Sequence, residues 1–146
     1  MDLLQKQRAA VADHIRLENE HRWADVPPTL VQDDRAFFDF VPLGQFNGAE
    51  GVRQLYQTIA TAFPDLHIEV TAAYDVPGCS IREGFLSGTH NGDYLGIPPS
   101  GVSIRIAFAA FFVFDQTSAD LLGERLYMDH AAAIQQLQAG KSVAAP

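Results

Sequence analysis

The longest stretch of strand-like hydrophobic pattern covers residues 81–114. It contains the runs IREGFLSGTH and VSIRIAFAAFFVF; the first lies between Gly78 and Gly92, and the second follows Gly101. β-Branched and aromatic residues between turn residues are typical of strands. Two consecutive prolines (98–99) fix φ and remove two backbone donors, which suits a connection and not a ladder. The pattern therefore predicts a long β-hairpin.

The second strand of this hairpin is apolar on both faces, which alternate along the chain. One face carries Ile104, Ile106, Phe108, Ala110, Phe112 and Phe114, and the other carries Ser103, Arg105, Ala107, Ala109, Phe111 and Val113. Because neither face suits water, we expect helices on one side and another sheet or a partner chain on the other. The face with Arg105 is poorly filled by its own alanines. It leaves room for a small molecule or for large side chains from a helix.

Helical and alternating patterns predict the remaining elements. They are a helix over 3–21, a short helix capped by Asp25, a strand over 35–41, a helix that opens at a capping box over 47–50 and stops at Pro64, a strand over 66–74, a strand over 121–129, and a helix over 130–140 capped by Asp129. Early helices and late antiparallel strands predict a single α+β domain over residues 1–140, with one curved sheet folded over the helices around a conical pocket. Residues 141–146 are expected to form a frayed tail.

Composition narrows the classes of function. The 146 residues carry a net charge of −8 with only 10 Lys and Arg residues, which argues against nucleic acid as a partner. The single cysteine, Cys79, cannot form an internal disulfide. The longest apolar run, residues 106–114, is far short of the ~20 residues that span a bilayer, and the first residues lack a signal-peptide pattern. We expect a soluble, cytoplasmic protein without a membrane partner.

Four segments occur in a recognisable order: TAFPDLHIEV, then SGTHNGDYLGIPPSG, then a strand with a polar turn, then GERLYMDHAAAIQQL. Together they resemble the SnoaL-like branch of the NTF2-like superfamily, which includes polyketide cyclases and ester cyclase relatives. The resemblance covers nearly the whole chain. It implies an NTF2-like cone, in which a curved mixed β-sheet wraps around the N-terminal helices. It also implies a homodimer through the outer sheet face, a small apolar organic ligand, and neither a metal nor an organic cofactor.

The chain departs from the family's pattern where the cyclases have their catalytic group. In those enzymes, the acid/base is an aspartate on the last strand, just before an aromatic residue. The matching position here is Leu126, before Tyr127, and Ala107 and Ala109 stand where the cyclases have polar pocket residues. The resemblance therefore does not by itself imply polyketide ring closure.

The parity that the resemblance implies directs one set of strand residues into the pocket. They are Glu83, Phe85, Ser87, Arg105, Ala107, Ala109, Glu124, Leu126 and Met128. Glu83, Arg105 and Glu124 are the first catalytic candidates, because an arginine that pairs with one buried carboxylate leaves the other free for proton transfer. The alternative is a buried ion-pair network that only ties three strands together.

Two histidines are further candidates. His14 and Glu18 lie four residues apart beside the apolar stripe of the first helix, where they either line the pocket or form an ordinary helical pair. His90 follows the first hairpin strand, where it either acts as a catalytic acid or base or braces the loop. The sequence contains no zinc-ligand spacing, phosphate loop, dinucleotide fingerprint or nucleophile elbow, so we expect no metal site.

Two classes of function remain. One is a cofactor-independent acid/base enzyme of the cyclase, isomerase, dehydratase or hydrolase type, which acts on a small, largely apolar carbonyl, ester or epoxide compound. The other is a non-catalytic protein that binds such a compound or serves as a dimeric accessory module. We further expect the loop over 91–101 to form the pocket rim. The face with Phe108, together with Tyr127, is expected to form the dimer interface.

Overall fold

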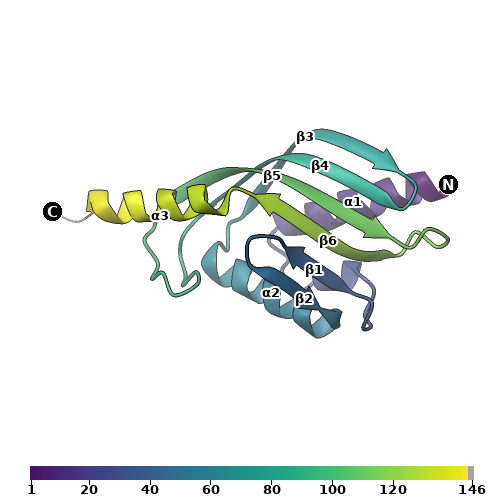
Figure 1. The fold of residues 1–146 in the computed structure, drawn as a ribbon, viewed down its shortest axis with the longest axis horizontal. Coiled ribbons are helices and arrows are strands. Elements are labelled where there is room, and N and C mark those ends of the chain that lie inside the picture. The colour runs from purple at the N-terminus through teal and green to yellow at the C-terminus, as the bar shows by residue number, and fades with distance from the viewer. Residues whose placement is uncertain (145–146) are drawn as a thin grey trace.

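The computed structural model describes residues 1–144 of the chain, with side chains up to residue 139. Its helices are α1 (Leu3–Asn19), α2 (Gly48–Ala62) and α3 (His130–Ala144), and a 3₁₀ turn covers Pro27–Thr29. Its strands are β1 (Phe37–Phe40), β2 (Gly44–Asn47), β3 (His67–Val76), β4 (Cys79–Thr89), β5 (Ser103–Phe114) and β6 (Leu121–Met128). Figure 1 shows these strands as one curved sheet, with α1 and α2 on the same face and α3 projecting beyond its end.

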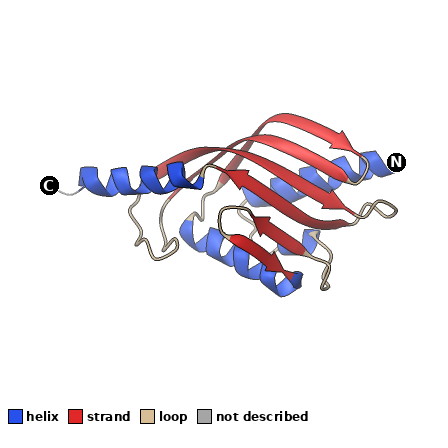
Figure 2. Cartoon of the chain, in the orientation of Figure 1, coloured by secondary structure: helices blue, strands red, loops and turns tan. Residues whose placement is uncertain are grey.

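The six strands follow the order β2-β1-β6-β5-β4-β3. β1 runs parallel to β6, and the other neighbouring strands are antiparallel. The register of β3 against β4 shifts between Val70 and Ala72, and such a bulge bends and twists a strand. The predicted α+β class, with a curved mixed sheet over the N-terminal helices, is confirmed, and Figure 2 shows the helix and strand layers.

The sequence missed one strand and misjudged two caps. β2 is short and polar (GQFN) and pairs only with β1 at the sheet edge, so it carries no strand-like pattern of its own. The predicted capping box at residues 47–50 is wrong, because the Asn47 side chain makes no capping hydrogen bond. Asp25 does not cap the 3₁₀ turn, whose N-cap residue is Val26. Asp129 does cap α3, where its carboxylate accepts from the Ala132 N–H at 3.0 Å.

α3 extends further than the sequence predicted. It passes the expected end at Gly140 and continues to Ala144, so the predicted tail is helical in its first part, and residues 145–146 of that tail lie outside the described residues. The helix covers the part of β5 that extends past the end of β6. There the Gln136 side chain accepts from the Arg105 N–H at 3.0 Å and donates to the Arg105 carbonyl at 3.1 Å. The Gln136 side chain thus makes the two backbone hydrogen bonds that a neighbouring strand would otherwise make with Arg105.

α1 is fixed to the sheet by a buried glutamine. The Gln7 side chain donates to the Val76 carbonyl at 3.0 Å and accepts from the Gly78 N–H at 2.8 Å, so it satisfies the turn between β3 and β4. Gln7 is only 2 % exposed. These bonds set the position of α1 across β3 and β4, and with it the position of the side chains further along the helix.

β5 turns its larger side chains toward the helices. Ile104, Ile106, Phe108, Phe112 and Phe114 are all buried on the inner face of the sheet. The predicted facing of this strand is therefore wrong, because we placed the face with Phe108 outside. Since both faces are apolar, the pattern alone did not distinguish them. The helices decide the facing, because close packing against them requires the bulky side and not the alanine side.

Within residues 1–144, no helix combines the length and the apolar character needed to cross a membrane.

Replacing Gln7 with Ala should lower the free energy of unfolding by about 1–3 kcal/mol, because it leaves buried backbone groups of the β3–β4 turn without partners. Urea unfolding followed by circular dichroism measures this. The matched control is Lys6→Ala, which changes an exposed residue on the same helix. Equal stability of the two variants would show that the Gln7 bonds do not hold α1.

Candidate functional site

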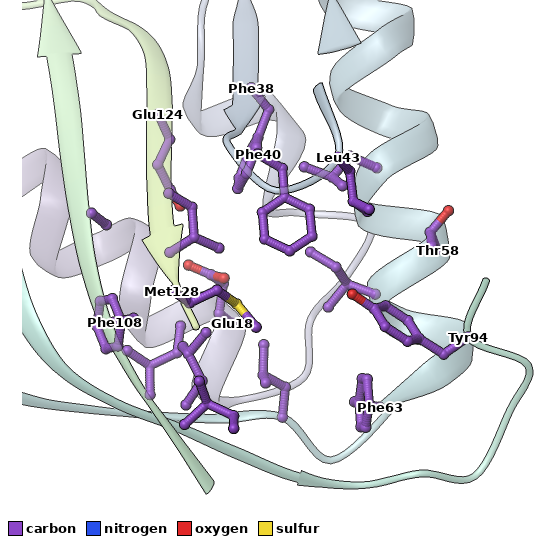
Figure 3. A pocket seen from close by; sticks show the side chains of 18 of the residues that line it. Glu18, Phe38, Phe40, Leu43, Thr58, Phe63, Tyr94, Phe108, Glu124 and Met128 are labelled. Atoms are coloured by element: carbon purple, nitrogen blue, oxygen red, sulfur yellow. The ribbon is translucent and has the colours of Figure 1, made fainter. Parts of the chain in front are cut away.

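A cavity of about 290 Å³ lies between the inner face of the sheet and helices α1 and α2. Its walls are mostly aliphatic and aromatic, with Ile15 from α1, Phe38 and Phe40 from β1, Phe108 and Phe112 from β5, and Leu126 from β6 among them. Figure 3 shows the carboxylate-bearing residues Glu18 and Glu124 on one side of this cavity and Phe63 and Tyr94 on the other. The cavity therefore combines an apolar interior with one charged wall.

The charged wall is centred on His14, which is fully buried. Its Nε2 atom lies 3.0 Å from Glu18 Oε1, 3.4 Å from Glu124 Oε1 and 3.0 Å from the Tyr56 hydroxyl. The helical spacing of four residues places Glu18 one turn after His14 on the same face of α1. Glu124 comes from β6 and Tyr56 from α2, so three elements meet at one imidazole. We call His14, Glu18 and Glu124 the acid cluster.

The other nitrogen of His14 is fixed by a threonine. His14 Nδ1 lies 2.6 Å from Thr29 Oγ1, and the Thr29 hydroxyl donates its hydrogen to the Val26 carbonyl at 2.7 Å. Thr29 must therefore accept from His14, and Nδ1 carries a hydrogen. This bond also sets the plane of the ring. Nε2 is consequently directed at the two carboxyl groups.

The acid cluster contains one ion pair and one additional proton. Burial alone would lower the pKa of His14, but the charge of Glu18 and the close approach of the Glu18 and Glu124 carboxyl groups outweigh it and raise the pKa to about 10. Burial raises the pKa of Glu124 above its ordinary value, an effect that His14 opposes and the Glu18 charge reinforces. Burial and the charges of Glu124 and Glu18 raise the pKa of Tyr56. One imidazolium thus balances one carboxylate, and the second carboxyl group favours its proton.

Glu124 is the incompletely satisfied member of the acid cluster. It is only 6 % exposed, yet its Oε1 atom has no hydrogen-bond partner among the described residues. The 3.4 Å contact with His14 is electrostatic and lacks hydrogen-bond geometry. A buried polar atom without a partner is costly, and it belongs to a residue that lines the cavity. A bound molecule with a suitable polar atom would remove that cost.

The donor atoms of the acid cluster lie within 4.8 Å of one another, which is close enough to reach one ion. With a pKa of about 10, however, the imidazole keeps both ring hydrogens near neutral pH and has no free lone pair for an ion. A metal would have to displace that proton. The expectation of no metal stays a prediction.

Five of the residues predicted to form the site do lie at the cavity. They are Glu18, Ser87, Glu124, Leu126 and Met128, and His14 lies directly behind the carboxyl groups. Glu18 lines the cavity, whereas His14 does not, and the two residues also form the helical pair at 3.0 Å. A buried base does pair with one carboxyl group and leave the other free, as we expected, but that base is His14 and not Arg105.

The predicted convergence of Glu83, Arg105 and Glu124 is wrong. Glu83 is exposed, and Arg105 pairs with Glu69 at 3.3 Å on the outer face of the sheet. The cause is the facing of β5, which is the reverse of the predicted one. Because paired residues of neighbouring strands point to the same face, the facing of β4 is reversed as well. Phe85, Ala107 and Ala109 follow the same parity and also lie on the outer face, where the Arg105 guanidinium sits 3.6 Å from the centre of the Phe85 ring.

His90 does not line the cavity, and the bracing role describes its contacts. It is fully buried, and its Nδ1 atom lies 2.9 Å from Ser100 Oγ at the far end of the loop. Its backbone N–H donates to the Val102 carbonyl, and its carbonyl accepts from the Gly101 N–H, both at 2.9 Å. His90 thus closes the base of the loop. A role as catalytic acid or base would need access to the cavity.

The loop after His90 forms the mouth of the cavity, as predicted. Tyr94 and Leu95 border the cavity, and the Tyr94 hydroxyl lies 2.7 Å from His130 Nε2 at the start of α3. Leu95 is 49 % exposed, so this side opens to solvent. The loop also needs Gly92, because a Cβ atom there would lie 2.0 Å from the Thr61 carbonyl oxygen of α2.

Sequence reasoning missed Tyr56 and Thr29. Tyr56 reads as one more apolar position on the stripe of α2, and Thr29 as a residue in a loop after two prolines. A weak signal was available for Tyr56, because a tyrosine on an otherwise aliphatic helix stripe needs a buried partner for its hydroxyl. Nothing in the sequence connects Thr29 to His14.

The fold and the site define a class of protein, a small α+β cone with an apolar cavity and a buried acid cluster. A family model described as SnoaL-like polyketide cyclase matches residues 7–137. The chain therefore belongs to the SnoaL-like polyketide cyclase family, as the resemblance indicated. No curated protein matches the chain.

Solved structures agree on the fold. A protein of Jannaschia sp. CCS1, assigned as a SnoaL-like polyketide cyclase, is 19 % identical with a TM-score of 0.81, over 95 % of this chain and 96 % of that one. AclR from Streptomyces galilaeus, assigned as a hydroxylase, is 14 % identical with a TM-score of 0.78, over 93 % and 98 %. A phenazine biosynthesis-related protein from Pseudomonas aeruginosa is 16 % identical with a TM-score of 0.74, over 93 % and 87 %. At these identities, the likeness concerns the fold alone.

The acid cluster should make stability depend on pH. Because the pKa of His14 is raised from 6.5 to about 10 by folding, its contribution is complete below pH 6.5 and is lost as the pH rises through 10. The raised pKa of Glu124 acts in the same direction, with a loss that begins above 4.5. The unfolding free energy should therefore fall between pH 6.5 and 10 more steeply in the natural protein than in His14→Gln.

Urea unfolding across this pH range measures the difference in slope. The matched control is His67→Gln, which changes an exposed histidine at the start of β3 and should leave the slope unchanged. Parallel curves for the natural protein and His14→Gln would mean that the acid cluster does not hold the extra protons.

Proposed function

We propose that the protein is a cofactor-independent acid/base enzyme that acts on a small, largely apolar carbonyl compound. The observation that carries this proposal is the pair of buried carboxyl groups, Glu18 and Glu124, which face one apolar cavity in different states. Glu18 is ion-paired with His14, whereas Glu124 has a raised pKa and an oxygen without a partner. Such a difference assigns one group as base and the other as acid.

The proposed reaction begins with proton abstraction next to the carbonyl group. The Glu18 carboxylate takes a proton from the α-carbon, and the electron pair of that C–H bond moves toward the carbonyl oxygen. That oxygen receives a hydrogen bond, and then the proton, from the Glu124 carboxyl group. The enol so formed either regains a proton at another carbon, which is isomerisation, or attacks a second carbonyl carbon, which is ring closure. The positive charge of His14 keeps Glu18 ionised before the reaction, and it stabilises the carboxylate that Glu124 becomes when it gives up its proton.

A second function is a non-catalytic pocket that binds the same kind of compound. One observation favours it: Leu126 lines the cavity at the position where the cyclases of the resemblance have their aspartate. If that position carries the chemistry throughout the family, the cavity of this chain only binds. The two functions differ in one measurable respect, which is the exchange of the α-hydrogens of a bound ketone.

The test of catalysis uses 2-tetralone in D2O, with loss of the α-hydrogen signals followed by proton NMR. The natural protein should accelerate exchange over buffer, and Glu18→Gln should lose about 100-fold or more of that acceleration, as expected for removal of a general base. Glu124→Gln should lose activity as well, because an amide hydrogen-bonds but does not transfer the proton. The control is Glu83→Gln on the outer face, which should keep full activity. Exchange at the buffer rate would leave only the binding function.

We propose that the protein forms a homodimer through the outer face of its sheet. Tyr74 and Tyr127 are exposed on this face, and Phe111 packs against Tyr127 with ring centres 5.6 Å apart. This face is the one that β5 turns away from the helices, so Phe108 has no part in it. Apolar side chains that gather on an exposed sheet face are typical of subunit contacts.

Replacing Phe111 with Glu should convert the dimer into a monomer at micromolar concentration, because it places a charge in the centre of the proposed contact. Sedimentation velocity measures the change. Gln54→Glu adds the same charge on the exposed side of α2 and should leave the dimer intact. A natural protein that sediments as a monomer would contradict the proposal directly.

A further inference from the structure

We propose that the cavity selects an uncharged compound of at most two fused rings, which enters with a single hydrogen-bond acceptor first and rejects the corresponding carboxylate. The proposal rests on the proposed function for the identity of the site, and it deepens that function by assigning a ligand class. Three features of the cavity carry it: the number of free polar atoms, the sign of the charges, and the volume.

One acidic residue of the cavity wall, Glu124, has a buried oxygen without a hydrogen-bond partner. The Thr58 hydroxyl donates to the Gln54 carbonyl at 3.1 Å, and the Tyr94 hydroxyl is bound to His130 at 2.7 Å. Glu18 is ion-paired with His14. Two buried side-chain atoms lack a hydrogen-bond partner among the described residues, His90 Nε2 and Glu124 Oε1, and of these two residues only Glu124 lines the cavity. A compound with a single carbonyl oxygen would satisfy it, because a protonated carboxyl group donates to such an oxygen.

The charges of the cavity disfavour an anion. No lysine or arginine lines the described cavity. The nearest positive group, His14, lies behind Glu18 and Glu124 and is engaged by them. A carboxylate ligand would have to lose its hydration and then face two acidic groups, without a cation to pair with. A ketone or ester of the same shape carries no charge, so it avoids both the loss of ionic hydration and the unpaired contact with the acidic groups.

The volume limits the size of the ligand. A cavity of roughly 150 Å³ accepts one benzene ring. The present cavity of about 290 Å³ therefore accommodates two such rings. A third fused ring would have to displace the Tyr94 and Leu95 side chains at the mouth. That displacement would break the 2.7 Å contact between Tyr94 and His130 and the bridge between Tyr94 and Ile97.

The position of the mouth sets the orientation. Leu43 and Leu95 border the cavity and are 39 % and 49 % exposed, so they mark its open side. Figure 3 places Glu124 on the side of the cavity away from Tyr94. The acceptor atom must therefore enter first, and the apolar rings then fill the space between Phe40 and Phe63.

The first experiment compares three molecules of one shape by isothermal titration calorimetry near neutral pH. They are 2-acetylnaphthalene, its hydrocarbon analogue 2-isopropenylnaphthalene, and the anion 2-naphthoate. The ketone should bind about 10-fold more tightly than the hydrocarbon, because the hydrocarbon leaves Glu124 without a partner. It should bind at least about 100-fold more tightly than the carboxylate. Equal binding of ketone and hydrocarbon, tighter binding of the carboxylate, or no binding of the ketone would each overturn the proposal.

The second experiment tests the size limit with acetophenone, 2-acetylnaphthalene and 2-acetylanthracene. Affinity should rise from one ring to two, as more apolar surface is buried, and fall by about 10-fold or more with the third ring. Tyr94→Ala, which removes the side chain at the mouth, should restore binding of the three-ring ketone. Binding of that ketone at or above the affinity of the two-ring ketone in the natural protein would refute the limit.

Two variants separate selectivity from folding. Glu124→Leu should abolish the preference for ketone over hydrocarbon, whereas Glu124→Gln, which keeps a donor, should retain most of it. Should Glu124→Leu fail to fold, retention of the preference in Glu124→Gln with its loss in Glu124→Ala decides the same point. An unchanged preference in the folded Leu or Ala variant would overturn the role of Glu124.

The outcomes for ligand class and for catalysis are independent. Ketone selectivity without exchange of the α-hydrogens of 2-tetralone would keep this inference and reject catalysis. Exchange that is lost in Glu18→Gln, together with equal binding of ketone, hydrocarbon and carboxylate, would keep catalysis and reject the inference.

Discussion

The burial of His14 between two carboxyl groups is the interaction on which the rest of the site depends. It joins α1, α2 and β6 at one imidazole, through contacts of 3.0 to 3.4 Å with Glu18, Tyr56 and Glu124. Two acids with one base in a buried place cannot all be charged and balanced, so the cluster must keep an extra proton. The proposed acid/base function of this otherwise apolar cavity depends on that proton. Replacing the cluster with hydrophobic residues would leave a closed core and no chemistry.

The cavity exists because helices α1 and α2 are held at fixed positions over the sheet, with space between the two layers. α1 is fixed at its start by Gln7, which bonds to the β3–β4 turn, and α2 packs against β1 and β2. The curved sheet then leaves space between β5 and the helices, and large side chains such as Phe108 and Phe112 line that space without filling it. The loop after His90 forms the mouth at one end, where Tyr94 contacts His130 of α3. Figure 1 shows both at the same end of the sheet.

The two faces of the sheet differ in what they carry. The inner face carries the bulky residues of β5 and meets the helices, whereas the outer face carries Arg105, the alanines and Phe111. On the outer face, Arg105 forms an ion pair with Glu69 and stacks on Phe85, both in contact with solvent. Such exposed contacts contribute little stability.

The sequence by itself determined the class of fold, the hairpin, the helix positions and the family, because periodicity and turn residues are local properties that survive without a partner. It also singled out His14, Glu18 and Glu124, although for different reasons. Only the tertiary structure decided the facing of β5, because a strand apolar on both sides specifies no inner face until the helices pack against it. That single choice removed Glu83 and Arg105 from the site. The tertiary structure also brought Tyr56 and Thr29 to His14, across 42 and 15 residues of chain. No local pattern in the sequence encodes these contacts.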